Sequence, residues 1–202
     1  MTTPAASAPR FVRDRMTWVL YGMLSLYSLA LNALGPMLPY LRQDLQLSNT
    51  TASLHGSSFA AGMILAGLGG ARLVQRLGSP LALSVGCVGL SLGALGLAFA
   101  NQLWLSLGAC LLMGALGSLV LLLVPTLLVE RHPRDHTRSL TEANVGGSLA
   151  AVAAPLLIGT LVQTGLGWRS VWLLAALSAL ILAGLGPHGP STPAATPEAQ
   201  GS

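Results

Sequence analysis

Six apolar stretches of about twenty residues each dominate this sequence. They lie at about 16–40, 51–73, 80–100, 103–129, 140–164 and 168–186. A helix needs about 20 such residues to cross roughly 30 Å of hydrocarbon. Only 8% of the 202 residues are charged, which is too few to give a soluble fold of this size a charged surface. The sequence therefore predicts an all-α membrane protein, a bundle of six transmembrane helices.

The connections between these stretches are short, so adjacent helices are expected to be antiparallel neighbours. Residues 101–102 join the third stretch to the fourth, and residues 165–167 join the fifth to the sixth. The expected organisation is a cytoplasmic N-terminal segment at 1–15 and a transmembrane domain at 16–187. A tail at 188–202, rich in Pro, Ala, Thr and Gly, is expected to be disordered and cytoplasmic.

The arginines are distributed unevenly between the two ends of the expected bundle. All ten basic residues are arginines, and only Arg42 and Arg169 fall in segments on the side opposite to the N-terminus. By the positive-inside rule, both termini face the cytoplasm in a multi-pass protein of the cell (inner) membrane. The net charge of +4 thus reflects topology, and the expected partner is the lipid bilayer and not a nucleic acid.

The two cysteines, Cys87 and Cys110, fall inside apolar stretches and have no metal-binding spacing. We interpret them as small packing residues. The sequence therefore predicts neither a metal site nor a cofactor.

Polar residues recur at helical spacing in several stretches. In the first stretch, Tyr21, Ser25, Ser28 and Asn32 follow one another at intervals of four, three and four residues, which places them on one helix face. Polar side chains are costly in lipid, so such a face is expected to line a cavity. The alternative for each stripe is close helix–helix packing.

Two further helices contribute candidates for the substrate cavity. These candidate residues are Ser58 in the second stretch, and Asn144 and Ser148 in the fifth. The fourth stretch carries small residues at the same spacing, for which packing is the favoured interpretation. The third and sixth stretches lack an extended polar face, so the first, second, fourth and fifth helices are expected to face a cavity.

The segment 70–80, between the second and third stretches, is the most specific local motif. It contains Gly70, followed by Gln75, Arg76 and Gly78. It resembles the loop of the major facilitator superfamily, in which Arg76 and Gly78 match an Arg-x-Gly core and Gln75 replaces an Asp. The start of the sixth stretch, at 167–172, also resembles the corresponding segment of that family.

This resemblance, over about residues 16–187, implies the N-terminal six-helix half of such a transporter. Members of that family transport small molecules by alternating access between two six-helix halves. The resemblance therefore implies a small-molecule substrate, bound in a weakly polar cavity that suits a neutral or amphipathic molecule. It also implies either a C-terminal half or a second copy in a parallel homodimer, unless the chain is a fragment.

Charged residues near the cytoplasmic surface suggest a gate. We expect Arg76 to pair with Glu130, with Arg138 close by, at the cytoplasmic ends of the helices. In the family the loop Asp joins this network, and Gln75 lacks that charge. The alternative is that Arg76 only anchors the topology.

Two titratable residues are candidates for proton coupling. Glu142 lies about one turn into the fifth stretch, and His55 lies near the outer end of the second. The alternatives are that Glu142 caps its helix or pairs with Arg138, four residues earlier, and that His55 has a structural role at the interface.

The function predicted from sequence is transport of a small solute, without enzymatic activity. An intramembrane serine protease needs a Ser and a His at the same depth, and the histidines other than His55 lie in a loop or in the tail. A non-transporting membrane scaffold and an inactive truncated transporter stay open as alternatives.

Overall fold

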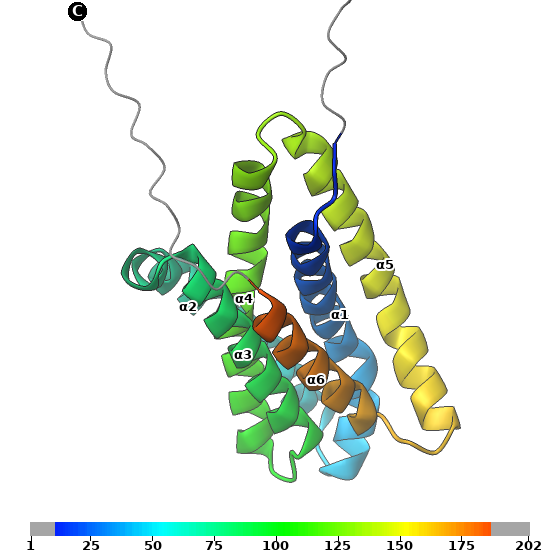
Figure 1. The fold of residues 1–202 in the computed structure, drawn as a ribbon. Coiled ribbons are helices and arrows are strands. Elements are labelled where there is room, and N and C mark those ends of the chain that lie inside the picture. Colours follow the sequence, from blue (N-terminus) through cyan, green and yellow to red (C-terminus); the bar gives the residue numbers. More distant parts are fainter. Residues whose placement is uncertain (1–10, 187–202) are drawn as a thin grey trace, which may run out of the picture.

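A computed structural model of the chain describes residues 11–186. The expected tail at 188–202 and the first ten residues of the expected N-terminal segment lie outside the described residues. Within that range the chain forms six α-helices and no strand (Figure 1). They are α1 (Arg15–Asp44), α2 (Asn49–Leu77), α3 (Ser79–Ala98), α4 (Leu103–Arg131), α5 (His136–Gln163) and α6 (Arg169–Leu185).

The prediction of an all-helical six-helix bundle is confirmed. The helices α1, α2, α4 and α5 are longer than their apolar stretches, because each continues through polar residues at one or both ends. Helices α1 to α5 are long and apolar enough to cross a membrane. Helix α6 is equally apolar but has 17 residues, the lower limit for a transmembrane helix.

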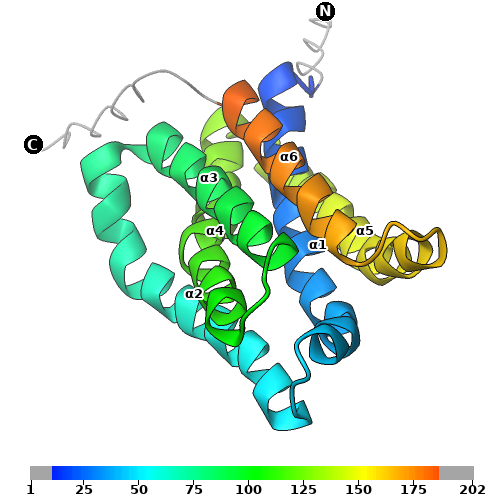
Figure 2. The same cartoon turned by 90° about the horizontal axis from the view of Figure 1, so that it is seen from below.

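The order of packing is not the order in the chain. Helix α4 packs against α3 and α2, α1 packs against α5, and α3 packs against α6. Figures 1 and 2 show α2 and α5 at opposite sides of the bundle, with α1 and α4 between them. Helices α2 and α5 are accordingly the least buried of the long helices.

Glycines allow the closest helix contacts. A Cβ atom added at Gly62 of α2 would lie 2.3 Å from the Leu111 carbonyl oxygen, and one at Gly114 of α4 would lie 2.2 Å from the Phe59 carbonyl oxygen. On the other side of α4, a Cβ atom at Gly93 of α3 would lie 2.9 Å from the Ala109 carbonyl oxygen. Such contacts between backbones replace the hydrophobic driving force that is missing between helices in lipid.

The turn between α2 and α3 explains one residue of the sequence motif. Gly78 ends α2 and precedes α3, and its backbone φ is 78°. Residues other than glycine rarely adopt such a value. Its N–H donates to the Val74 carbonyl oxygen at 2.8 Å, which closes the last turn of α2. The glycine at this position therefore has a conformational role.

The contact between α2 and α4 yields a testable prediction. Gly114→Ala should lower the free energy of unfolding by about 1–3 kcal/mol, because the added methyl group has no space beside the Phe59 carbonyl. Gly108→Ala, on the same helix, is the control, because nothing lies within 4 Å of its added Cβ. Thermal unfolding in detergent, followed by size-exclusion chromatography, measures both variants. Equal melting temperatures for the two would contradict the close contact.

Candidate functional site

A cavity at the α1–α5 interface has a volume of about 640 Å³. Helix α1 contributes Trp18, Tyr21, Gly22 and Ser25 to its walls. Its other walls are formed by Arg13, which precedes α1, and by Thr141, Glu142, Val145, Gly146 and Leu149 of α5. One end of this cavity is therefore charged, and its side walls are apolar or aromatic.

A second cavity, of about 220 Å³, continues along the same interface and also reaches α4. It is lined by polar groups of Ser28, Asn144 and Ser148 and by apolar residues such as Leu24 and Leu121. Neighbouring parts of the same two helices line the two cavities, with Gly146 at the larger one and Gly147 at the smaller one. The Ser28 hydroxyl donates to the Gly147 carbonyl oxygen at 2.8 Å. An added Cβ at Gly146 would lie 2.8 Å from the Ser25 hydroxyl, so the absence of a side chain at Gly146 permits the close approach of the two helices.

A cluster of charged side chains closes the arginine-rich end of the α1–α5 interface. Arg13 donates two hydrogen bonds to the Glu142 carboxylate, from Nε at 2.7 Å and from Nη2 at 2.6 Å. Arg138 donates from Nε to Oε1 of Glu142 at 3.1 Å, and the Tyr21 hydroxyl donates to Oε2 at 3.2 Å. The Phe11 ring lies 5.5 Å from the Arg13 guanidinium and 5.1 Å from that of Arg138, within the range of cation–π attraction.

A second group of contacts joins the start of α1 to the end of α4. Asp14 caps α1 by accepting from the Thr17 amide at 2.9 Å, and it also accepts from Nε of Arg131 at 2.8 Å. The Arg131 guanidinium, and then the Thr17 donors, hold the pKa of Asp14 well below its usual range. The Thr17 hydroxyl also lies 2.7 Å from Nε2 of His132. The start of α1 is thus tied to α4 as well as to α5.

The opposite end of the bundle has its own polar contacts. Trp168 donates from Nε1 to Asp44 at 3.1 Å, and Arg169 forms an ion pair with the same carboxylate. Arg169 also donates to the Ala100 carbonyl oxygen at 2.9 Å. These bonds tie the end of α1 to the start of α6 and to the loop after α3.

The residues expected to line a substrate cavity separate into two groups. Tyr21 and Ser25 line the larger α1–α5 cavity, and Ser28, Asn144 and Ser148 line the smaller one. The remaining two lie elsewhere. Asn32 is exposed and donates to the Ser28 carbonyl oxygen of its own helix at 2.8 Å. The Ser58 hydroxyl donates to the Leu107 carbonyl oxygen at 2.8 Å, so it forms part of the α2–α4 contact.

His55 also lies between α2 and α4. Its side chain is fully buried, with Nδ1 2.9 Å from the Ala52 carbonyl oxygen and Nε2 2.8 Å from the Ser106 hydroxyl. It is therefore enclosed by protein, and proton coupling by His55 stays a prediction. Both ring nitrogens have partners, so the described contacts account for its burial.

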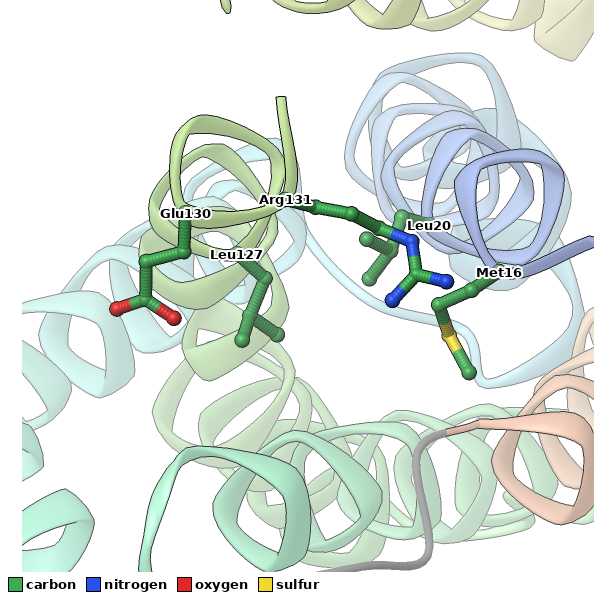
Figure 3. A pocket seen from close by; sticks show the side chains of 5 residues that line it. All are labelled: Met16, Leu20, Leu127, Glu130 and Arg131. Carbon is green, nitrogen blue, oxygen red and sulfur yellow. The ribbon is translucent and has the colours of Figure 1, made fainter. Parts of the chain in front are cut away.

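The gate pair expected from sequence is not formed in the structure. Within residues 11–186, neither Arg76 nor Glu130 takes part in an ion pair, and both side chains are exposed. Glu130 borders a cavity of about 240 Å³ together with Met16, Leu20, Leu127 and Arg131. Figure 3 shows its carboxylate on the side of α4 away from the Arg131 guanidinium.

The physical reason is the position of α2 at the edge of the bundle. It meets α4 most closely at Gly62, and the contact continues as far as Gly70, which packs against Leu119 and Leu122 of α4. Beyond Gly70, the motif residues Gln75 and Arg76 are exposed. The ion pairs at this end use Arg13, Asp14 and Arg131 instead.

The sequence interpretation missed Arg13, Asp14, Arg131 and Phe11 as members of a site. They precede or follow the apolar stretches. The two arginines enter the sequence interpretation only through the positive-inside rule, and Phe11 and Asp14 have no role in it. One signal was present, because Asp14 stands three residues before Thr17, the spacing of an N-cap contact. The pairing of Glu142 with Arg138, given as an alternative, does occur.

The comparisons with known proteins agree with this architecture. The family model of the Major Facilitator Superfamily matches residues 20–201. The chain therefore belongs to the Major Facilitator Superfamily, as a multi-pass membrane protein with the six-helix fold of an N-terminal half. No curated protein matches the chain. Membership in this superfamily supports a membrane transporter and is consistent with a protein that is not an enzyme.

The Asp14–Arg131 pair yields a prediction about pH. Folding lowers the pKa of the Asp14 carboxylate, whose unfolded value is about 3.8. Such a carboxylate stabilises the fold when the pH is above the unfolded pKa. This stabilisation is lost as the pH falls through the lower pKa of the folded state. Asp14→Asn should therefore melt at a lower temperature than the wild type at neutral pH. The difference should shrink as the pH falls below about 4.

Thermal unfolding in detergent across this pH range provides the measurement. Asp135→Asn is the control, because Asp135 forms no side-chain cap bond at the start of α5. A difference between Asp14→Asn and the wild type that stays constant down to the lowest pH would contradict the ion-pair explanation.

Proposed function

We propose that this chain transports a small solute by alternating access, as one six-helix half of a secondary transporter of the Major Facilitator Superfamily. The observation that carries the proposal is the pair of cavities along the α1–α5 interface, closed at one end by charged side chains. Family membership supports the general class of function.

The exposed residues of the bundle favour the presence of a second six-helix unit beside it. The outer faces of α3 and α6 expose large apolar residues such as Leu92, Leu177 and Ile181, which suit lipid. Helices α1, α2 and α5 also expose large apolar residues, but their exposed residues include the polar Asn32, Ser57 and Asn144, which do not suit lipid. Small and polar residues on one side of a membrane bundle favour coverage by other helices. We propose a C-terminal half or a second copy of this chain as that cover.

The proposed orientation follows from the arginines within the described residues. Arg42 and Arg169 lie at the end of the bundle where α1 stops and α6 starts. The opposite end carries Arg13, Arg15, Arg72, Arg76, Arg131, Arg134 and Arg138. By the positive-inside rule, we assign the arginine-rich end to the cytoplasm of the cell (inner) membrane. The charged cluster around Glu142 then closes the α1–α5 interface on the cytoplasmic side.

Alternating access is testable without knowing the substrate. In a variant with Cys87 and Cys110 replaced by alanine, Ser148→Cys should react with a membrane-impermeant maleimide from both sides of the membrane. Ser148 is exposed in the smaller cavity, and each state of the transport cycle opens that cavity to one side. Labelling is compared between intact cells and inverted vesicles.

Leu173→Cys, on the apolar outer face of α6, is the control and should react from neither side. Labelling of Ser148→Cys from a single side under all conditions would contradict alternating access.

The same assay identifies the gate. Glu142→Gln should increase labelling of Ser148→Cys from the cytoplasmic side, because it removes the charge that holds Arg13 and Arg138 together. Glu130→Gln tests the gate expected from sequence. Glu130 forms no ion pair within residues 11–186, so labelling should stay at the level of the parent. An increase with Glu130→Gln alone would favour the pair with Arg76.

A further inference from the structure

We propose that the larger α1–α5 cavity binds an amphipathic anion. Its carboxylate or phosphate group would be held by Arg13, which lines the cavity, and by Arg138, which lies beside it and bonds the lining residue Glu142. Its apolar part would lie against Trp18, Val145 and Leu149. The inference names the class of ligand that binds at the site of the proposed function. It rests on the proposed function only because both take this cavity as the binding site. It narrows the neutral or amphipathic molecule expected from sequence to an amphipathic anion, because Arg13 contributes a charge that lies outside the apolar stretches.

The charge balance of the site favours an anion. Two guanidinium groups surround one carboxylate, that of Glu142, so the cluster carries a net charge of about +1. The neighbouring pair of Asp14 and Arg131 is neutral as a whole. Glu142 already accepts bonds from both arginines and from Tyr21, which leaves little capacity to bind a cation.

Both arginines keep free donors. Glu142 engages Nε and Nη2 of Arg13 and only Nε of Arg138. Within residues 11–186, Nη1 of Arg13 and both terminal nitrogens of Arg138 make no hydrogen bond. The two side chains are 36% and 56% exposed, so a ligand can reach these groups. The planar fork of a guanidinium matches the geometry of carboxylates and phosphates.

The walls beside the charged end suit an apolar group. Trp18, Val145 and Leu149 are 60%, 54% and 67% exposed and border the same cavity. Its volume of about 640 Å³ lies within the usual range for small-molecule sites. A charged end with an apolar wall is the arrangement that an amphipathic anion requires. Such an anion can be a free organic acid or the head group of an anionic lipid.

Direct binding tests the ligand class. The full chain is placed in nanodiscs of neutral lipid at neutral pH, and binding of 2-naphthoate is measured by equilibrium dialysis against empty nanodiscs. The neutral analogue 2-naphthamide has the same ring system without the charge. We expect the carboxylate to bind at least about tenfold more tightly than the amide, as for a charge-assisted hydrogen bond. Equal affinities would overturn the proposal.

Two pairs of variants locate the site. Val145→Trp should abolish binding by filling the cavity, whereas Val152→Trp, two turns further on the same exposed face, should bind as the wild type does. Arg138→Gln should weaken binding about tenfold, and Arg134→Gln in the α4–α5 loop should not. Size-exclusion chromatography and circular dichroism confirm that each variant is folded. Unchanged binding in Val145→Trp and Arg138→Gln would overturn the assignment.

Native mass spectrometry from phosphatidylglycerol nanodiscs separates the two sources of the anion. Lipid retained by the wild type and lost in Val145→Trp identifies a lipid head group. Naphthoate binding without retained lipid identifies a free organic acid. These binding measurements do not require transport. If the anion binds but Ser148→Cys is labelled from one side only, this inference is retained and the proposed function is rejected. Two-sided labelling without binding would do the reverse.

Discussion

The close approach of α4 to α2 and α3 is the constraint on which the rest of the bundle depends. In lipid, apolar side chains gain little by leaving their surroundings, so helices associate through close backbone contact and polar bonds. Gly114 of α4 meets the backbone of α2, and Gly93 of α3 meets the backbone of α4. Any side chain at these positions would separate the helices. The unit of α2, α4 and α3 therefore has a fixed spacing, against which α1 and α6 are placed.

The α1–α5 interface is built differently. Ser28 donates a hydrogen bond to the Gly147 carbonyl oxygen, and two cavities lie along the interface. Ion pairs, rather than apolar packing, hold its arginine-rich end together. Exposed ion pairs contribute little to stability, so the arginine-rich end of this interface can separate at a low cost in free energy.

Much of this organisation is predictable from sequence, and the rest depends on how the helices are rotated and tilted. Apolar stretches of membrane length predict the six helices because each helix satisfies its own backbone polar groups. The contact of Glu142 with Arg138 is predictable because residues four apart share a helix face. The contact of Glu142 with Arg13, 129 residues away in the chain, is not. It requires that α1 and α5 pack directly, whereas α2 lies at the other side of the bundle and leaves Arg76 without Glu130.

The same two arginines take part in closure of the α1–α5 interface and in the proposed anion site. An anion that bonds Arg138 competes with Glu142 for the same positive charge, so its binding weakens the ion pairs that hold α1 to α5. Linkage is reciprocal, so a conformation in which these ion pairs are broken binds the anion more tightly, by the same factor. An anion at this site would therefore favour opening of the arginine-rich end. The pairing of Arg13 with Glu142 through two bonds, and of Arg138 through one, makes Arg138 the donor that is released first.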